Sequence, residues 1–581
     1  MHVIATAGHV DHGKSTLIRG LTGMEPDRWA EERRRGLTID LGFAWTRLAD
    51  GCTAAFVDVP GHERFVPNML AGIGPVPAVL FVVAADEGWM PQSDEHLDAL
   101  DALGVRHGVL AVTRCDLADP RAATEEAAAA LSGTVLADIP AVQVSGVTGT
   151  GLGDLRRELD LLVHRMPAAD QDADVRLWID RVFTVRGAGT VVTGTLTAGT
   201  LRVGDRLLLH PAGVTCAVRG LHSLGSAEPQ VNAVSRVAVN LRGVDCGQVQ
   251  RGDALLSPDR WLTTEVFDVR IHPAPATWPA ELMLHVGSAA VPVRVRPLGP
   301  EHARLTTRVP LPLRIGDRAL LRDPGNHRIH GGLDVLDVRP PQLTRRGAAR
   351  APAAEQASMG AVPHGRAALH RRRVIRADVL RAMGATPPAA GPWLISESYR
   401  TERAARLTDV LAQHGEDDPL ADGMPVEAAR HALDLPDPGL VAEVAETAGI
   451  ALHAGRLHLE QLRLPDRIRS AVAAVRDALI DHPFHAPTAD ELAALGLGDR
   501  ELAAAARFGE LLRVAPGLVL LPDAEQTALD RLAALPSPFT LSQARRALDT
   551  SRRVAVPLLE LLARRGRTRR LADGTHRVVS R

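Results

Sequence analysis

The segment richest in chemical groups is a glycine-rich loop near the start of the chain. Residues 8–15 read Gly-His-Val-Asp-His-Gly-Lys-Ser, which satisfies the pattern G-x-x-x-x-G-K-[ST]. Glycines in such a loop let backbone N–H groups face phosphate oxygens, while the lysine reaches the β- and γ-phosphates and the hydroxyl binds Mg²⁺. The nucleotide contacts that we predict in and just after this loop are Asp11, His12, Gly13, Lys14, Ser15 and Thr16.

Further polar residues follow at the ends of apolar runs. Asp58 lies in the run 55–59 and is placed to reach Mg²⁺ through water, and Gly61 can turn its N–H toward a γ-phosphate. Thr38 is expected to bind the metal only when that phosphate is present. His62 lies at the γ-phosphate edge, where a side chain must orient the attacking water, so it is the candidate catalytic residue; a purely structural histidine is the alternative.

The base of the nucleotide is expected to be guanine. Residues 113–116 read Thr-Arg-Cys-Asp where most GTPases have Asn-Lys-x-Asp, and Asp116 can accept hydrogen bonds from the guanine N1–H and amino group. Thr113, Arg114 and Ser145 complete the predicted base site, with Arg114 able to stack on the purine face. We therefore predict that the chain binds GTP rather than ATP.

The elements that position these residues follow from composition. Residues 1–168 alternate continuous apolar runs with helix-like stretches, which is typical of an α/β P-loop GTPase domain with a parallel sheet. Two β-barrel domains are predicted at 172–260 and 261–345, because alternation of period two replaces the apolar runs there. A linker is predicted at 346–370, and tandem winged-helix modules of all-α/α+β type at 371–581. The predicted fold class is therefore multidomain.

The C-terminal end is strongly basic. Residues 536–581 hold eleven arginines and no lysine against three acidic residues, although the whole chain has a net charge of −2. Such asymmetry is typical of a polyanion site, whereas a solvated charged face is the alternative. Arg552 and Arg553 open a predicted helix, and Arg569 falls on the predicted wing. These three arginines are the candidate RNA-binding residues of the last module, about 536–581.

Composition excludes several classes of protein. Apolar residues make up 45% and charged residues 23% of the 581, which is typical of globular proteins. The four cysteines have no spacing that suggests a metal pair or a disulfide framework. No secretory signal and no apolar run of about 18 residues is seen, so we expect a cytoplasmic protein without a membrane segment.

Three segments of the GTPase region, residues 8–14, 35–40 and 58–62, are together similar to those of translational GTPases. Residues 177–196 and 549–560 resemble the second domain and the last winged helix of the selenocysteine-specific elongation factor family. The resemblance implies GTP and Mg²⁺ as cofactors, and ribosome-stimulated GTP hydrolysis with His62 orienting water. It also implies three partners: selenocysteinyl-tRNA, the ribosome, and a hairpin in selenoprotein mRNA that marks UGA codons. The factor itself is expected to be a monomer.

The same resemblance implies a selenocysteine pocket. Its residues would be Phe43, Asp180, Arg181 and Arg236, with Asp180 and Arg181 forming an ion pair that supplies a held cation. A selenol is a stronger acid than a thiol, so a cationic site would favour it. Taken from the residues alone, a surface ion pair of Asp180 with Arg181 and a solvated Arg236 remain the alternative.

Two other functions stay open from the sequence. One is a different tRNA-binding translational GTPase, such as an ordinary aminoacyl-tRNA carrier or an initiation factor. Against a simple carrier stand the roughly 210 residues beyond the linker. The other is a winged-helix nucleic-acid-binding regulator with a GTPase switch, against which the two predicted barrels stand.

Overall fold

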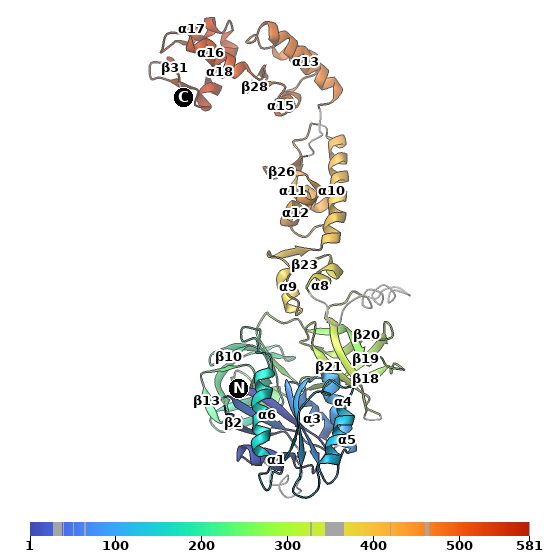
Figure 1. Ribbon diagram of the computed structural model, residues 1–581. Helices are drawn as coiled ribbons and strands as arrows, with labels where there is room; N and C mark the ends of the chain where they lie inside the picture. Colours follow the sequence, from blue (N-terminus) through green and yellow to red (C-terminus); the bar gives the residue numbers. More distant parts are fainter. Residues whose placement is uncertain are drawn as a thin grey trace. The chain divides into compact units, whose positions relative to one another are not determined.

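The computed structural model describes residues 1–26, 38, 40–49, 51–62, 65–325, 328–342, 365–418, 420–458 and 464–579. Most of the predicted linker, and Arg35, Gly36 and Leu37 of the second similar segment, lie outside these residues. The chain forms two compact units, Met1–Pro392 and Trp393–Arg581, which we describe separately (Figure 1).

The N-terminal part of the first unit is a six-stranded sheet with the order β2-β3-β1-β4-β5-β6. Its strands are β1 (His2–Ala7), β2 (Gly42–Arg47), β3 (Thr53–Asp58), β4 (Ala78–Ala84), β5 (His107–Thr113) and β6 (Ala141–Gln143). Strand β2 runs antiparallel to β3, and the other neighbours are parallel. Every residue of β4 is buried, as expected for a strand that is covered on both faces of a parallel sheet.

Helices cover both faces of this sheet. They are α1 (Lys14–Thr22), α3 (Val66–Ile73), α4 (Pro91–Leu103), α5 (Arg121–Leu131) and α6 (Leu152–Arg165). Leu17 of α1 and Leu155 of α6 belong to one buried cluster, whereas Met69 of α3 and Leu97 of α4 belong to the other. The carboxyl ends of the parallel strands meet at one edge, where ligands bind in folds of this type.

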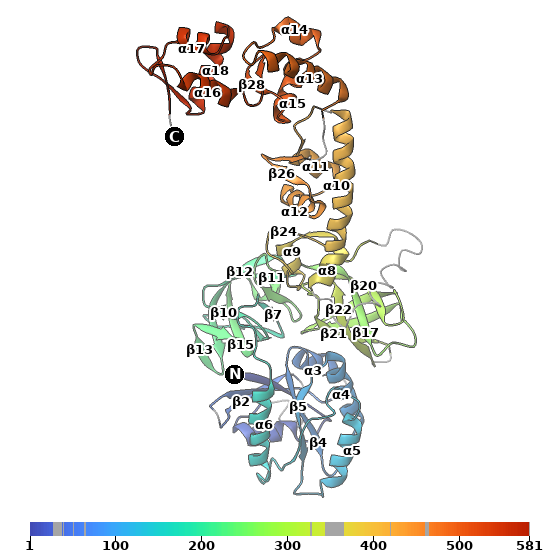
Figure 2. The same ribbon diagram turned by 45° about the horizontal axis from the view of Figure 1, so that its top comes forward.

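Two β domains follow. The first barrel is an eight-stranded sheet, and the second is a closed barrel of six strands (Figure 2). The first contains β7 (Arg176–Trp178), β8 (Arg181–Val185), β9 (Gly189–Leu196), β11 (Arg206–His210), β12 (Val214–Ser223), β13 (Ser226–Glu228), β15 (Ser235–Arg242) and β16 (Ala254–Leu256), beside the ribbon β10 (Thr200–Arg202) with β14 (Gln230–Asn232). The second contains β17 (Thr264–His272), β18 (Glu281–Val286), β19 (Ala289–Pro297), β20 (His302–Leu311), β21 (Arg318–Arg322) and β22 (Ile329–Asp337). Burial alternates along β15, because one face of the strand packs into the core.

Charged and aromatic side chains join the two barrels. Arg176 pairs with Asp317, with its Nη2 2.7 Å from Oδ1, and Arg314 pairs with Asp174 at 2.7 Å. The ring of Trp261 lies between these arginines, with its centroid 4.6 Å from the Arg176 guanidinium and 3.6 Å from that of Arg314. We call these two ion pairs and the Trp261 ring the Trp261 clamp.

The first unit ends with α8 (Gly365–Arg372), β23 (Val374–Arg376) and α9 (Ala377–Ala382). Helix α8 is fixed to the second barrel by buried charges, since Arg371 lies 3.2 Å from a carboxylate oxygen of Asp337 and is 4% exposed. Arg304 pairs with Asp268 at 2.7 Å in the same region. Burial raises the pKa of Asp268, although the neighbouring arginines oppose this shift.

The second unit repeats a pattern of helices followed by a short hairpin. Its helices are α10 (Glu397–Asp417), α11 (Val426–Ala432), α12 (Pro438–Ala448), α13 (Asp466–Asp481), α14 (Ala489–Ala494), α15 (Asp499–Arg507), α16 (Ala524–Ala533), α17 (Leu541–Ala547) and α18 (Arg552–Arg564). Its strands are β24 (Trp393–Ile395), β25 (Met424–Pro425), β26 (Ala451–His453), β27 (Arg456–His458), β28 (Leu512–Ala515), β29 (Leu518–Leu520), β30 (Thr568–Arg570) and β31 (His576–Val578). The last two modules share one core, in which Phe484 and Phe539 are both 1% exposed. The predicted fold class is confirmed.

No helix among the described residues combines the length and the apolar character that crossing a membrane requires.

Candidate functional site

The glycine-rich loop lies between β1 and α1 and cannot accept larger residues at its first glycine. Gly8 has φ +123°, and a Cβ there would lie 2.0 Å from the carbonyl oxygen of Val82. Gly13 has φ +81° and immediately precedes α1, so the loop leads into a helix N-terminus. Backbone N–H groups and the positive end of the helix dipole therefore face the phosphate position.

Lys14 is held along the loop. Its Nζ donates hydrogen bonds to the carbonyl oxygens of Gly8, at 3.0 Å, and His9, at 2.6 Å. Gly61 lies against the same group, because a Cβ at Gly61 would be 2.7 Å from Lys14 Nζ and 2.7 Å from the amide nitrogen of Val10. The structure thus brings the predicted γ-phosphate residues Lys14 and Gly61 together.

Four oxygen-bearing side chains, those of Thr6, Ser15, Thr38 and Asp58, converge at one point. Ser15 Oγ donates a 2.7 Å hydrogen bond to Asp58 Oδ2 and lies 3.2 Å from Thr38 Oγ1. Thr6 Oγ1 donates to the other carboxylate oxygen of Asp58 at 2.7 Å. Hydroxyl and carboxylate oxygens are the ligands that Mg²⁺ prefers, so the residues present fit this ion. Ser15, Thr38 and Asp58 would hold it, directly or through water.

Two residues of the predicted base site contact the glycine-rich loop. Thr113 Oγ1 donates to the carbonyl oxygen of His12 at 2.7 Å. Arg114 pairs with Asp86 at 2.8 Å and Glu87 at 3.1 Å, and it also donates to the carbonyl oxygen of Asp11. The Arg114 guanidinium, which is expected to stack on the purine, is therefore held by Asp86, Glu87 and the glycine-rich loop.

The remaining predicted nucleotide contacts lie on neighbouring segments. Asp116 is exposed after β5, and Thr16 is half-buried in the first turn of α1. Ser145 is buried, and its Oγ accepts from the amides of Val147, at 3.3 Å, and Thr148, at 3.1 Å. Ser145 therefore shapes the loop after β6.

His62 directly follows Gly61 and is half-buried. Its carbonyl oxygen accepts a 2.8 Å hydrogen bond from the amide of Phe65, and the two rings are 6.0 Å apart between centroids. The ring thus belongs to the segment that touches the phosphate loop and leads into α3.

Two loop-supporting residues on α4 escaped the sequence analysis. Nδ1 of His96 accepts a 3.0 Å hydrogen bond from the amide of Gly8, and Oε1 of Gln92 accepts one of 2.9 Å from the amide of Val10. Burial lowers the pKa of His96 to about 3, so the ring is neutral and Nδ1 is free to accept. Their spacing of four residues, which places both on one helix face, was the signal available in the sequence.

A third overlooked residue joins the first barrel to α3. Arg251 donates to the carbonyl oxygen of Pro67 at 2.9 Å and to the side-chain oxygen of Asn68. Burial lowers the pKa of Arg251, while Asp40 and Asp180 nearby oppose this shift. The helix that follows the His62 segment is thereby tied to the barrel.

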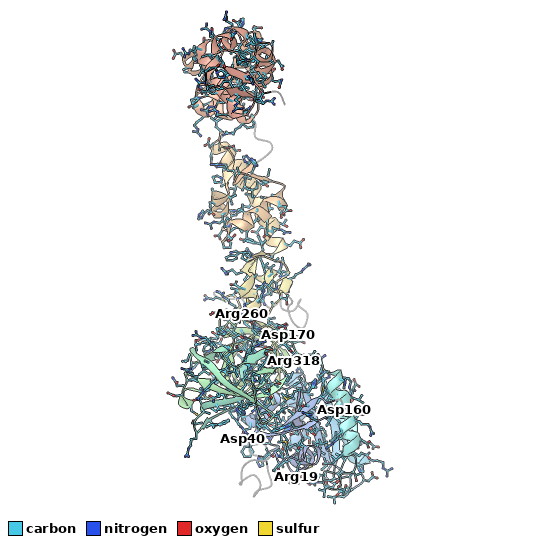
Figure 3. All side chains as sticks on the ribbon, turned by 90° about the vertical axis from the view of Figure 1, so that its left-hand side faces the viewer. Arg19, Asp40, Asp160, Asp170, Arg260 and Arg318 are labelled. Atoms are coloured by element: carbon cyan, nitrogen blue, oxygen red, sulfur yellow. The ribbon has the colours of Figure 1, made fainter. Side chains whose placement is uncertain are left out.

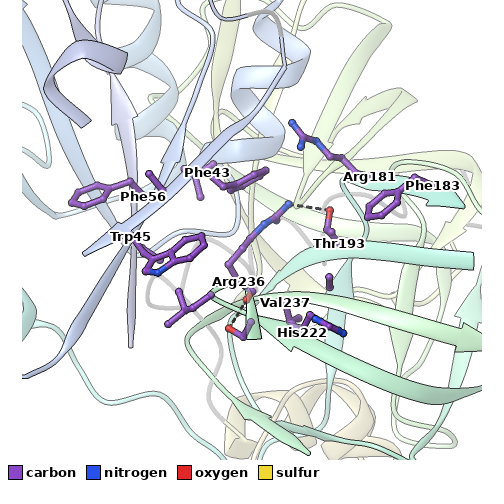
Figure 4. A pocket seen from close by; sticks show the side chains of 16 residues that line it. Phe43, Trp45, Phe56, Arg181, Phe183, Thr193, His222, Arg236 and Val237 are labelled. Carbon is purple, nitrogen blue, oxygen red and sulfur yellow. Dashed lines mark hydrogen bonds between the residues drawn. The ribbon is translucent and has the colours of Figure 1, made fainter. Parts of the chain in front are cut away.

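A cavity of about 210 Å³ lies where β2 of the sheet meets the first barrel. Phe43, Arg181 and Arg236 line it together with Thr193 and His222 (Figure 4). The guanidinium of Arg236 lies 4.1 Å from the centroid of the Phe43 ring, and that of Arg181 lies 5.0 Å from it. The aromatic face therefore supports both cations.

The expected ion pair between Asp180 and Arg181 is wrong. Asp180 pairs with Arg236, whose Nη2 is 2.6 Å from Oδ1, and it also accepts a 2.8 Å hydrogen bond from Thr193 Oγ1. Arg181 pairs instead with Asp40 at 2.8 Å. Successive side chains in extended backbone point to opposite faces, so neighbours in sequence were poor candidates for partners. The four predicted pocket residues are nevertheless brought to one place.

The predicted RNA-binding arginines differ in their surroundings. Arg552 is exposed at the N-terminus of α18, and Arg569 is exposed on β30. Arg553 donates to the carbonyl oxygens of Ala486, at 2.5 Å, and Pro487, at 2.9 Å. The structure thus gives Arg553 a role in joining the last two modules.

Family models match three parts of the chain. The model of the elongation factor Tu GTP binding domain matches residues 1–165, and that of elongation factor Tu domain 2 matches 189–256. The model of the elongation factor SelB winged helix matches residues 530–577. The chain is also 35% identical over 482 residues to the selenocysteine-specific elongation factor of Escherichia coli, covering 79% of this chain and 78% of that protein. The chain belongs to the selenocysteine-specific elongation factor family.

Similarity to two further proteins supports this family assignment. The selenocysteine-specific elongation factor of Desulfomicrobium baculatum is 41% identical over 337 residues, which cover 55% of this chain and about half, 53%, of that protein. A crystal structure of a bacterial selenocysteine-specific elongation factor matches 100% of both chains with a TM-score of 0.69 and 25% identity. Family membership places the glycine-rich loop in a translational GTPase.

Proposed function

We propose that this factor delivers selenocysteinyl-tRNA to the ribosome in its GTP form and hydrolyses the GTP there. The observation that carries the proposal is the small cavity between β2 and the first barrel. Two guanidinium groups line it, and each is placed by a carboxylate, Asp40 for Arg181 and Asp180 for Arg236. A cavity of this size and charge suits a short anionic side chain presented at the end of a tRNA.

The acidity of the side chain gives the basis for selection. A selenol is a stronger acid than a thiol and is anionic at neutral pH. A thiol with a pKa of about 8.5 is only about 3% ionised at pH 7, which disfavours cysteine by roughly 2 kcal/mol in a site that requires an anion. The serine hydroxyl is excluded more strongly, because it stays neutral and would leave the cations without a charged partner.

The nucleotide bound at the GTPase site would determine when the tRNA is bound and released. In this proposal Asp11–Thr16, Asp58, Gly61, Thr113, Arg114, Asp116 and Ser145 bind GTP, and Ser15, Thr38 and Asp58 hold Mg²⁺, which neutralises charge on the phosphates. His62 orients the attacking water. Residues 1–168 then bind nucleotide, and the regions 172–260 and 261–345 bind tRNA.

The C-terminal modules, 371–581, are proposed to bind a hairpin in selenoprotein mRNA. Arg552 is exposed on α18 and Arg569 on β30, which would serve as the recognition helix and the wing of the last module, about 536–581. Exposed arginine side chains on such elements suit the phosphate backbone and accessible bases of an RNA hairpin. Recognition of this hairpin would limit delivery to the UGA codons that it marks.

Dissociation constants for one tRNA carrying selenocysteine or serine test the proposal. With a non-hydrolysable GTP analogue, the wild type should bind the selenocysteine form far more tightly. Arg236→Ala should weaken that form by about 1–3 kcal/mol, on the order of one charge-assisted hydrogen bond, and Arg236→Lys should weaken it less. The serine form should barely change.

The matched control is Arg219→Ala, which removes an exposed arginine of the same barrel that does not line the cavity. Equal binding of both aminoacyl forms by the wild type would support an ordinary aminoacyl-tRNA carrier. Sequencing the tRNA that co-purifies with the GTP-bound factor provides an independent check on the cargo.

A further inference from the structure

The segment that follows Thr38 forms one wall of the cationic cavity. Asp40 Oδ2 lies 2.8 Å from Arg181 Nη2, and the carbonyl oxygen of Leu41 accepts a hydrogen bond from the same guanidinium. Phe43 lies under Arg181 and Arg236. Asp40, labelled in Figure 3, is therefore a residue of the nucleotide-binding domain that places a residue of the barrel.

The same segment also reaches the predicted metal site. Thr38 Oγ1 lies 3.2 Å from Ser15 Oγ, which itself donates to Asp58. Thr38 is buried, with 9% of its surface exposed. Two residues separated by a single position can be no more than about 7 Å apart at their Cα atoms, so Asp40 cannot remain in place if Thr38 moves far.

The two arginines of the cavity are held in different ways. The side chain of Asp180, which pairs with Arg236, is 2% exposed and lies within the barrel. The side chain of Asp40, which pairs with Arg181, is 29% exposed and belongs to the other domain. Arg236 is thus placed by its own barrel, whereas the placement of Arg181 depends on where the Thr38 segment lies.

We propose that Asp40 is a positioning residue that makes the arginine cavity depend on the bound nucleotide. When Thr38 is held at the metal site, Asp40 and Leu41 fix Arg181 beside Phe43, and the cavity presents two ordered cations. When Thr38 leaves that site, Arg181 loses its contacts with Asp40 and Leu41, whereas Arg236 keeps its contact with Asp180. This inference rests on the proposed function, since the ligand is the anionic aminoacyl side chain of a tRNA.

Orientation rather than competition is the role that the geometry supports for Asp40. The carboxylate binds one side of the planar guanidinium, and the aromatic ring supports its face. A guanidinium has five N–H donors, so binding one carboxylate and one carbonyl does not by itself exclude a ligand anion. Asp40 also compensates the charge of Arg181 before the tRNA arrives, as Asp180 does for Arg236.

The test measures selenocysteinyl-tRNA affinity with a GTP analogue and with GDP, for the wild type, Asp40→Asn and Asp180→Asn. Asp40→Asn should reduce the ratio of the two affinities about 5- to 50-fold, mainly by weakening the GTP form. Asp180→Asn should weaken tRNA binding in both nucleotide states and leave the ratio nearly constant. Asp119→Asn, which removes an exposed ion pair with Arg121, is the matched control.

A second readout separates positioning from a structural defect. Asp40→Asn should bind GDP alone within about twofold of the wild type and GTP alone up to about fivefold more weakly, because the contact with Arg181 stabilises the ordered position of Thr38. Linkage then requires that selenocysteinyl-tRNA increase the affinity for GTP less in this variant than in the wild type. A structural defect would instead lower the affinity for both free nucleotides.

The outcomes distinguish the two levels of the proposal. A wild type that prefers selenocysteinyl-tRNA and GTP, together with an Asp40→Asn variant whose affinity ratio is unchanged, would overturn the role of Asp40 alone. A wild type without preference for selenocysteine over serine would overturn the proposed function, and the role of Asp40 with it. A reduced ratio with normal GDP binding supports the inference.

Discussion

The backbone amide of Gly8 donates a 3.0 Å hydrogen bond to Nδ1 of His96, a buried histidine on the neighbouring helix α4. The bond requires a neutral ring with an accepting Nδ1, and burial maintains this state by lowering the pKa to about 3. The first turn of the phosphate loop thus depends on a side chain more than eighty residues away in sequence.

His96 should therefore make folding stability depend on pH. Its folded-state pKa of about 3 lies below the ordinary 6.5, so between these values the unfolded chain takes up a proton that the folded chain does not. The contribution of His96 to the free energy of unfolding is fully present above about pH 6.5. It is lost as the pH falls, by up to about 1.4 kcal/mol per pH unit. Urea unfolding of the full chain at pH 7, 6 and 5 measures this slope.

Replacing the histidine should reduce the slope. His96→Gln should unfold with a smaller pH dependence than the wild type, whereas His431→Gln, at an exposed position of the second unit, should not reduce it. A wild-type slope in His96→Gln would show that this ring is not kept neutral by burial.

His62→Ala should separate hydrolysis from binding. In the proposed role His62 contacts water rather than nucleotide, so affinities for GTP and GDP should remain nearly unchanged. Ribosome-stimulated hydrolysis should fall by about 100-fold or more, on the scale seen when a transition-state contact is removed. Single-turnover hydrolysis on ribosomes is the measurement, and an unchanged rate would assign His62 a structural role.

Ser15 and Thr38 should differ in which nucleotide they favour. Ser15→Ala should weaken GTP and GDP alike, because Ser15 lies in the first turn of α1 and would bind the metal ion with either nucleotide. Thr38→Ala should weaken GTP about tenfold, roughly one hydrogen bond, and GDP much less, since only the γ-phosphate orders this segment. Equilibrium titration with fluorescent nucleotides tests both, and equal losses in Thr38→Ala would contradict its role as a switch.

Arg552, an exposed arginine at the N-terminus of α18, should contribute to RNA binding. In the full chain, Arg552→Ala should weaken binding of a selenoprotein mRNA hairpin and reduce its salt dependence by about one unit of slope, as for one lost phosphate contact. Arg553→Ala should mainly lower the unfolding temperature of the second unit, because Arg553 holds Ala486 and Pro487. Equal affinity of the full chain for duplex DNA and for the RNA hairpin would favour the alternative function, a winged-helix nucleic-acid-binding regulator.

The parts of the site that could be predicted are those encoded by local spacing. The loop of residues 8–15 needs glycine where Gly8 meets the backbone of Val82, and this requirement is visible as a short pattern. The buried strand β4 is likewise visible as an unbroken apolar run. Both features depend on residues that are neighbours in the sequence, so the sequence alone was sufficient to predict them.

Partners that meet only through the tertiary fold could not be predicted in the same way. Asp180 was expected to pair with its neighbour Arg181 but pairs with Arg236, 56 positions away. Arg181 reaches across the domain boundary to Asp40, and Arg114 reaches Asp86 and Glu87. An arginine has many carboxylates within reach of its long side chain, so the choice depends on how the strands are placed.

The Trp261 clamp has a consequence for how such factors can be recombined. Arg176 and Asp174 come from the first barrel, whereas Asp317 and Arg314 come from the second. A chimaera that takes one barrel from a distant relative would place an indole between mismatched charges and leave half-buried arginines without their carboxylates. We therefore expect a chimaera to fold well only when both barrels are exchanged as a pair.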